Sequence, residues 1–179
     1  MAGGGTSTPP ARVRIDLACE ADGDELIAAN MAARDWHAPY VALFTDAEGF
    51  AGWLGRASEP VNRAFVARTA RGGELVAVFN VTQIVMGNFC SAYLGYHGYP
   101  DTAGRGLVGE ALDLVLAEAF EGIGLHRLEA NIQPGNARSI ALVRRAGFRQ
   151  EGFSPRYLMI DGAWRDHERW AITAEDRAA

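Results

Sequence analysis

The chain has 179 residues and a formal net charge of −5, and 49% of its residues are hydrophobic. This size and apolar content predict one domain with a sizeable core, and an acidic balance without a long basic run argues against a nucleic-acid-binding protein. No apolar run is long enough to span a membrane, so the sequence does not predict a membrane protein.

The first ten residues, MAGGGTSTPP, have the composition of a disordered tail and lack the basic start and apolar centre of a signal peptide. We therefore expect a disordered tail over residues 1–10, a single domain over residues 11–179 and a cytoplasmic location. Cys19 and Cys90 lie far apart and fit no metal-ligand spacing, so they predict two reduced, buried thiols and no metal site.

The first half of the chain predicts two helices and three strands. Acidic residues open the first helix, and an Arg-Gly-Gly turn joins two segments rich in Val, Phe and Ala into a hairpin. The predicted elements are a strand over Val13–Leu17, a helix over Asp22–Arg34, a helix that begins near Asp46, and strands over Arg63–Thr69 and Glu74–Ile84.

A strand over Ser91–Tyr96 leads to a glycine-rich turn over Ala103–Gly109, and Leu107–Phe120 shows the apolar period of an amphipathic helix. Glycines let the backbone approach a ligand closely, and amide groups at a helix start favour phosphate oxygens. The turn therefore predicts a pyrophosphate cradle. Taken alone, a turn of this kind is equally consistent with a plain strand-to-helix connection.

The second half continues with an alternating strand over Leu125–Ile132 and a helix that Asn136 caps and Gly147 ends. An extended segment opens at Phe148, and a hairpin turn begins at Asp161. This succession of strands and helices predicts a mixed α/β sheet.

Three stretches of the sequence resemble motifs of the GCN5-related N-acetyltransferases (GNAT). The pyrophosphate loop of that family resembles AGRGLVGEAL, its later strand and helix resemble LHRLEANIQPGNARSIALVRRAGF, and the C-terminal hairpin of its RimJ/RimL branch resembles YLMIDGAWRDHERWAIT. The specific match spans Phe89 to Asp176, about half of the chain. The resemblance implies the GNAT fold, in which a mixed, mostly antiparallel central sheet is flanked by helices and splayed at the acyl-coenzyme A site.

The resemblance also implies acetyl-coenzyme A (acetyl-CoA) as co-substrate. The strand that ends near Tyr96 would hold the pantetheine arm and the thioester oxygen, and the amides from Arg105 to Gly109 would hold the pyrophosphate. Ala103 departs from the family pattern, because Gln or Arg usually begins the loop. The implied coenzyme-binding residues are Leu94, Tyr96, Ala103, Gly104, Arg105, Gly106, Leu107, Val108, Gly109, Asn131, Asn136 and Ser139.

The acid that protonates the departing sulfur is implied to be Ser139. Many relatives carry a tyrosine for this role where this chain has Val143, and the RimJ/RimL branch has the serine one turn earlier. From the residues alone, Asn136 followed by Ser139 is ordinary helix-capping chemistry.

Glu129 and His37 are the preferred candidates for the base, among plausible groups that also include His126 and Asp35. Glu129 shares a strand face with Arg127, so a salt pair is the alternative explanation. His37 lies where this fold usually places the acceptor, and a surface-loop histidine is its alternative.

We expect transfer of acetyl to a primary amine by direct attack in a ternary complex, with a protein N-terminus as the preferred acceptor. An α-amine has a reference pKa near 7.7–8.0 against about 10.4 for lysine, so it is more often neutral and needs no strong base. A small-molecule amine acceptor and a non-catalytic acyl-CoA-binding module are the alternatives, and a homodimer is consistent with the sequence.

Overall fold

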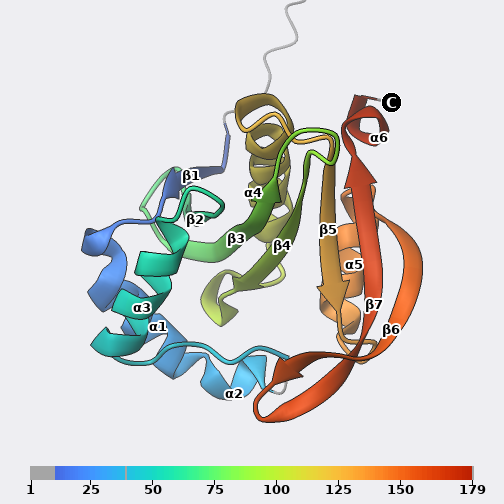
Figure 1. The fold of residues 1–179 in the computed structure, drawn as a ribbon. Helices are drawn as coiled ribbons and strands as arrows, with labels where there is room; N and C mark the ends of the chain where they lie inside the picture. The colour runs from blue at the N-terminus through green and yellow to red at the C-terminus, as the bar shows by residue number, and fades with distance from the viewer. Residues whose placement is uncertain (1–10, 39, 179) are drawn as a thin grey trace, which may run out of the picture.

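A computed structural model describes residues 11–38 and 40–178. The predicted tail over residues 1–10 lies outside the described residues, as do positions 39 and 179. The strands form a single seven-stranded sheet in the order β1-β2-β3-β4-β5-β7-β6 (Figure 1). Its strands are β1 (Val13–Leu17), β2 (Arg63–Thr69), β3 (Leu75–Val85), β4 (Ser91–Gly98), β5 (Arg127–Ile132), β6 (Arg149–Ile160) and β7 (Ala163–Thr173).

Helices flank the sheet on both faces, as the resemblance implies. One core cluster packs α4 and α5 against the sheet through residues such as Leu112, Leu116 and Val143, and a second packs α1 and α3 through Leu26 and Phe50. The helices are α1 (Gly23–Ala32), α2 (Arg34–His37), α3 (Ala47–Ala57), α4 (Leu107–Ala117), α5 (Ala137–Arg145) and α6 (Ala174–Ala178), with short turns η1 (Glu20–Asp22), η2 (Pro100–Thr102) and η3 (Glu118–Gly122).

The sheet is antiparallel except between β4 and β5, which pair in parallel over a short stretch. Their register covers Ser91–Arg127, Ala92–Leu128 and Tyr93–Glu129. Further along, β4 residues 94–98 pair with β3, and β5 residues 130–132 pair with β7. We call these two diverging edges the β4–β5 splay. The mixed, mostly antiparallel and splayed sheet is thus confirmed.

Some boundaries differ from the sequence prediction. The first predicted helix is divided, because Ala33 leaves helical geometry at φ −92° and ψ 2° and the chain restarts as α2. The short helix α6 was not predicted. Cys19 is exposed and Cys90 half-buried, so the prediction of buried thiols is wrong. Both cysteines lie in connections between elements, where a small apolar side chain need not face the core.

A chain of buried polar groups ties α1 to the end of β4. Nδ2 of Asn30 donates to the carbonyl of Phe44 at 3.0 Å, and Oδ1 of Asn30 accepts from the Tyr99 hydroxyl at 2.9 Å. Nε2 of His97 lies 3.2 Å from the same hydroxyl. Because the Tyr99 proton goes to Asn30, His97 donates through Nε2, which fixes its neutral tautomer.

This network predicts a loss of stability in acid. Burial, and to a smaller extent the neighbouring His37, lowers the pKa of His97 to about 3. Histidine in the unfolded chain has a pKa of about 6.5, so between about pH 6.5 and about 3 the unfolded chain binds a proton at this residue that the folded chain does not bind. The stabilisation is complete above about pH 6.5 and is lost as the pH falls toward 3.

Denaturant titrations at about pH 7.5 and about pH 5 measure this effect. The free energy of unfolding should be lower at the acidic pH than at the neutral pH, and His97→Gln should make this difference smaller. His126→Gln is the matched control, because the His126 side chain is 55% exposed. An unchanged pH dependence in the His97 variant would contradict the prediction.

Candidate functional site

The glycine-rich turn forms an open helix start of the predicted kind. Gly104 and Gly106 have φ values of 75° and 78°, a left-handed conformation that favours glycine. Gly106 is the N-cap of α4 and carries no side chain to cap the first amides. The amide of Gly109 donates to the Gly106 carbonyl at 3.1 Å. The amides suited to an anion therefore lie at residues 104–108, which is the predicted set shifted by one position toward the N-terminus.

The side chains at the start of α4 hold this helix against the sheet. Leu107 is buried in the main core cluster. Val108 packs over the end of β4. A Cβ added to Gly98 would lie 3.1 Å from Cγ2 of Val108. Both residues can therefore contribute backbone amides to a ligand while their side chains fix the helix.

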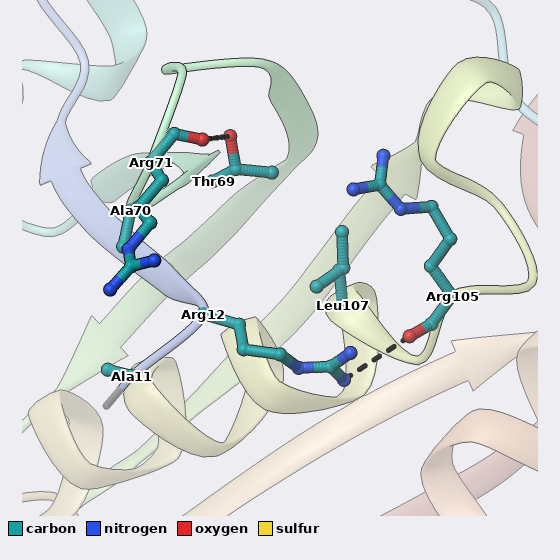
Figure 2. A pocket seen from close by; sticks show the side chains of 7 residues that line it. All are labelled: Ala11, Arg12, Thr69, Ala70, Arg71, Arg105 and Leu107. Carbon is teal, nitrogen blue, oxygen red and sulfur yellow. Dashed lines mark hydrogen bonds between the residues drawn. The ribbon is translucent and has the colours of Figure 1, made fainter. Parts of the chain in front are cut away.

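Three arginine side chains lie beside the turn, and two of them pair with carboxylates. A cavity of about 290 Å³ is bordered by the guanidinium groups of Arg12, Arg71 and Arg105, which approach it from three segments (Figure 2). Arg12 donates to the Glu110 carboxylate at 2.9 Å and to the Arg105 carbonyl at 3.2 Å, so it fastens the start of the chain to the turn. Arg105 pairs with Glu74 at 3.2 Å. Sequence reasoning missed Arg12 because 98 residues separate it from Glu110.

On one face of the sheet, the predicted acid meets a tyrosine of β4. The Tyr96 hydroxyl lies 2.5 Å from Oγ of Ser139 and 3.2 Å from its carbonyl oxygen. Oδ1 of Asn136 caps α5 by accepting from the Ser139 amide at 3.2 Å. The capping alternative therefore holds for the Asn136 side chain, whereas the Ser139 hydroxyl makes a different contact. Val143 is fully buried in the main core cluster.

The opposite face of the β4–β5 splay has different chemistry. Alternation along the strands places Gly95 and His97 of β4 on the same face as Glu129 and Asn131 of β5. Gly95 is exposed, and Oδ1 of Asn131 is buried without a hydrogen-bond partner in the described part of the chain. The Glu129 carboxylate accepts from Nε of Arg127 at 2.8 Å, so the salt-pair alternative for Glu129 is observed.

His37 is buried, so its interpretation as a surface-loop histidine is wrong. Its ring contacts that of His97 edge-on, with centroids 5.4 Å apart, and that of Trp36 at 4.9 Å. Burial lowers the pKa of His37, while a hydrogen bond to the Gly98 backbone opposes this effect. Nε2 is buried and has no hydrogen-bond partner among the described residues. The ring is therefore neutral near pH 7 and offers one uncommitted nitrogen.

Long-range contacts join the α2 segment to the start of α5. The Tyr40 hydroxyl donates to the Gly135 carbonyl at 2.8 Å, and the guanidinium carbon of Arg138 lies 5.2 Å from the centre of the Trp36 ring. These contacts place His37 and Ser139 in neighbouring parts of the fold. Residues 40 and 135 are 95 positions apart, so no local signal in the sequence points to the contact.

Two further properties concern residues 11–38 and 40–178. No group of three or more His, Cys, Asp or Glu side chains gathers there in a metal-binding arrangement. None of the helices in this part of the chain combines the length and apolar character needed to cross a membrane.

Residues 12–149 match the acetyltransferase (GNAT) domain family. The chain is 41% identical over 103 residues to [ribosomal protein uS5]-alanine N-acetyltransferase of Escherichia coli (strain K12), an alignment that covers 58% of this chain and 53% of that protein. It is 35% identical over 108 residues to the probable N-acetyltransferase YjcK of Bacillus subtilis (strain 168), which covers 60% of each. The alignments thus span little more than half the length of these relatives.

Solved structures show the same fold. The complex of Mycobacterium smegmatis RimJ with CoA-disulfide superposes with a TM-score of 0.83 at 29% identity, over 92% of this chain and 83% of that one. Spermidine N-acetyltransferase from Vibrio cholerae, in complex with CoA and spermine, gives 0.81 at 17% identity over 95% and 100%, a likeness that shows the fold alone. The family that the three sequence motifs predict is confirmed: this chain belongs to the acetyltransferase (GNAT) family.

Proposed function

We propose that the protein is an N-acetyltransferase that uses acetyl-CoA to acetylate a primary amine, with a protein N-terminal α-amine as acceptor. The observation that carries the proposal is the position of the β4–β5 splay. It opens after Tyr93 and Glu129, and the open start of α4 follows β4 in the chain. A thioester laid along β4 would have its pyrophosphate at the amides of residues 104–108 and its carbonyl near the backbone of Tyr96.

In the proposed reaction, the amine attacks from one face of the β4–β5 splay and the sulfur is protonated from the other. The amine nitrogen attacks the thioester carbon from the face of Gly95 and Asn131, the C–N bond forms, and the C–S bond breaks with its electron pair going to sulfur. Ser139, on the other face, donates its hydroxyl proton to that sulfur. A proton returned from water then restores Ser139 and balances the proton that the amine released.

His37 is the group that we favour as base. The carboxylate of Glu129 is already engaged by Arg127, whereas Nε2 of His37 has no hydrogen-bond partner in the described part of the chain. Because Nε2 is enclosed, this role requires the α2 segment to move when the acceptor binds. The orphaned Oδ1 of Asn131 faces the same side and suits an N–H donor such as the acceptor amine.

Similarity to the uS5-alanine N-acetyltransferase of Escherichia coli supports a protein N-terminus as acceptor. A small amine is the second candidate, because the net charge of −5 suits a small cationic amine as well as it suits a basic peptide. An acyl-CoA-binding module without activity is the third.

The proposed function predicts peptide-dependent release of thiol from acetyl-CoA by the purified chain. The three candidate functions are distinguished by a panel of acceptors. The panel contains peptides with free N-termini, matched peptides with blocked N-termini, and small polyamines. Turnover confined to free N-termini supports the proposal. Preference for polyamines would replace the acceptor, acetyl-CoA binding without turnover would favour the module, and no binding would overturn the proposal.

The base assignment predicts unequal effects of two substitutions. His37→Gln should lower kcat/KM for the amine roughly 100-fold, because general-base catalysis contributes about that much or more. Glu129→Gln should change it little, and neither should weaken acetyl-CoA binding. The opposite ranking would assign the base to Glu129, and two small effects would leave proton removal to water.

The open face of Gly95 predicts a substitution that harms activity without harming the fold. A Cβ at this position meets no atom within 4 Å, and its backbone needs no left-handed conformation. Gly95→Val should therefore change stability by less than about 0.5 kcal/mol, yet block the splay and abolish turnover. Gly55→Val in α3 is the control, since a Cβ there is equally free. A fully active Gly95 variant would refute a reacting site on this face.

A further inference from the structure

The Tyr96 side chain has a place in the site beyond that of its backbone. From the middle of β4 it crosses to the first turn of α5, where its hydroxyl lies 2.5 Å from Oγ of Ser139. The same hydroxyl lies 3.2 Å from the Ser139 carbonyl. One phenol therefore faces two acceptors on one residue, although it has a single proton to donate.

The two possible hydrogen-bond patterns differ in what they leave for a ligand. If the phenol donates to the carbonyl, the Ser139 hydroxyl must donate to Oη and has no proton left for another group. If the phenol donates to Oγ, the proton of Ser139 is free to point elsewhere. Both patterns use the 2.5 Å contact between the two hydroxyls. In the second pattern the phenol proton lies on this short contact, whereas in the first it lies on the 3.2 Å contact to the Ser139 carbonyl, and we favour the shorter one.

The packing and the protonation state of Tyr96 suit its phenol to donate a hydrogen bond to Oγ of Ser139. Its ring packs against Phe79, with centroids 5.9 Å apart, and against the main core cluster, so its position is fixed. Burial raises the pKa of Tyr96 to about 12, and the Ser139 contact opposes that shift only in part. The phenol therefore keeps its proton throughout the working pH range and remains a donor.

We propose that Tyr96 is a positioning residue that donates to Oγ of Ser139 and thereby aims the serine proton at the departing sulfur of the coenzyme. The inference rests on the proposed acetyl transfer. Tyr96 gives up no proton in the step: the proton that reaches sulfur is that of Ser139, and the phenol hydrogen bond makes this hydroxyl a stronger donor. The Ser139 hydroxyl would also stabilise a thiolate on bound CoA by donating a hydrogen bond to it.

The test uses Tyr96→Phe, which keeps the ring that packs on Phe79, together with Ser139→Ala and the double variant. The first readout needs no acceptor: the pKa of the thiol of bound CoA, followed by the ultraviolet absorbance of the thiolate. Tyr96→Phe should raise this pKa by about one unit, which corresponds to a tenfold weaker preference for the thiolate. Ser139→Ala should raise it at least as much, and the double variant no further than Ser139→Ala.

The second readout is turnover with the acceptor found for the native chain. Tyr96→Phe should lower kcat roughly tenfold with little change in the dissociation constant of acetyl-CoA, and it should have no effect in the Ser139→Ala background. Additive losses in kcat, or equal losses in kcat and coenzyme affinity, would overturn the inference and make Tyr96 a packing residue. A thiol pKa independent of Tyr96 would overturn it too. Failure of the native chain to bind CoA would instead overturn the proposed function, and the inference with it.

Discussion

The parallel pairing between β4 and β5 ends after three residue pairs, at Tyr93 and Glu129. Past Tyr93 and Glu129 each strand keeps its other neighbour, so the sheet remains continuous while two strand edges face each other unpaired. Buried backbone groups without a partner are costly. A ligand that lies along such an edge can supply the missing hydrogen bonds, and Gly95, Tyr96, Glu129 and Asn131 lie on the two strands that border this opening.

The splay also separates two kinds of chemistry by strand alternation. Tyr96 faces α5 and the hydroxyl of Ser139, whereas its neighbour His97 faces α1 and α2. In the proposed reaction, a carbon between the strands would have the Ser139 hydroxyl on one side and the face that receives the amine on the other. Because neighbouring residues of a strand point to opposite faces, two consecutive positions of β4 serve both sides.

The buried network from Asn30 through Tyr99 to His97 fixes the structure on the side of β4 that faces α1 and α2. It joins α1 to the end of β4, and His37 packs against His97. Such a network specifies a unique arrangement because each buried polar group that loses its partner costs about 1–3 kcal/mol. The α2 segment is therefore held against the end of β4 through His37. On the other side of the molecule, Arg12 holds the glycine-rich turn by contacts to Glu110 and Arg105.

The sequence alone predicts the family, the order of the strands and of the main helices, and the glycine-rich turn at the start of α4, but not the division between α1 and α2 or the short helix α6. These features have local causes, because each depends on residues close together in the chain. The causes are apolar periodicity, the N-cap residue Asn136 and glycines that adopt positive φ. The tertiary structure alone decided which side chains meet. The Tyr96–Ser139 contact spans 43 residues, and the burial of His37 depends on a histidine 60 positions away. The sequence favoured a surface loop for His37, and this was wrong because burial is set by packing between elements distant in the chain rather than by any local pattern.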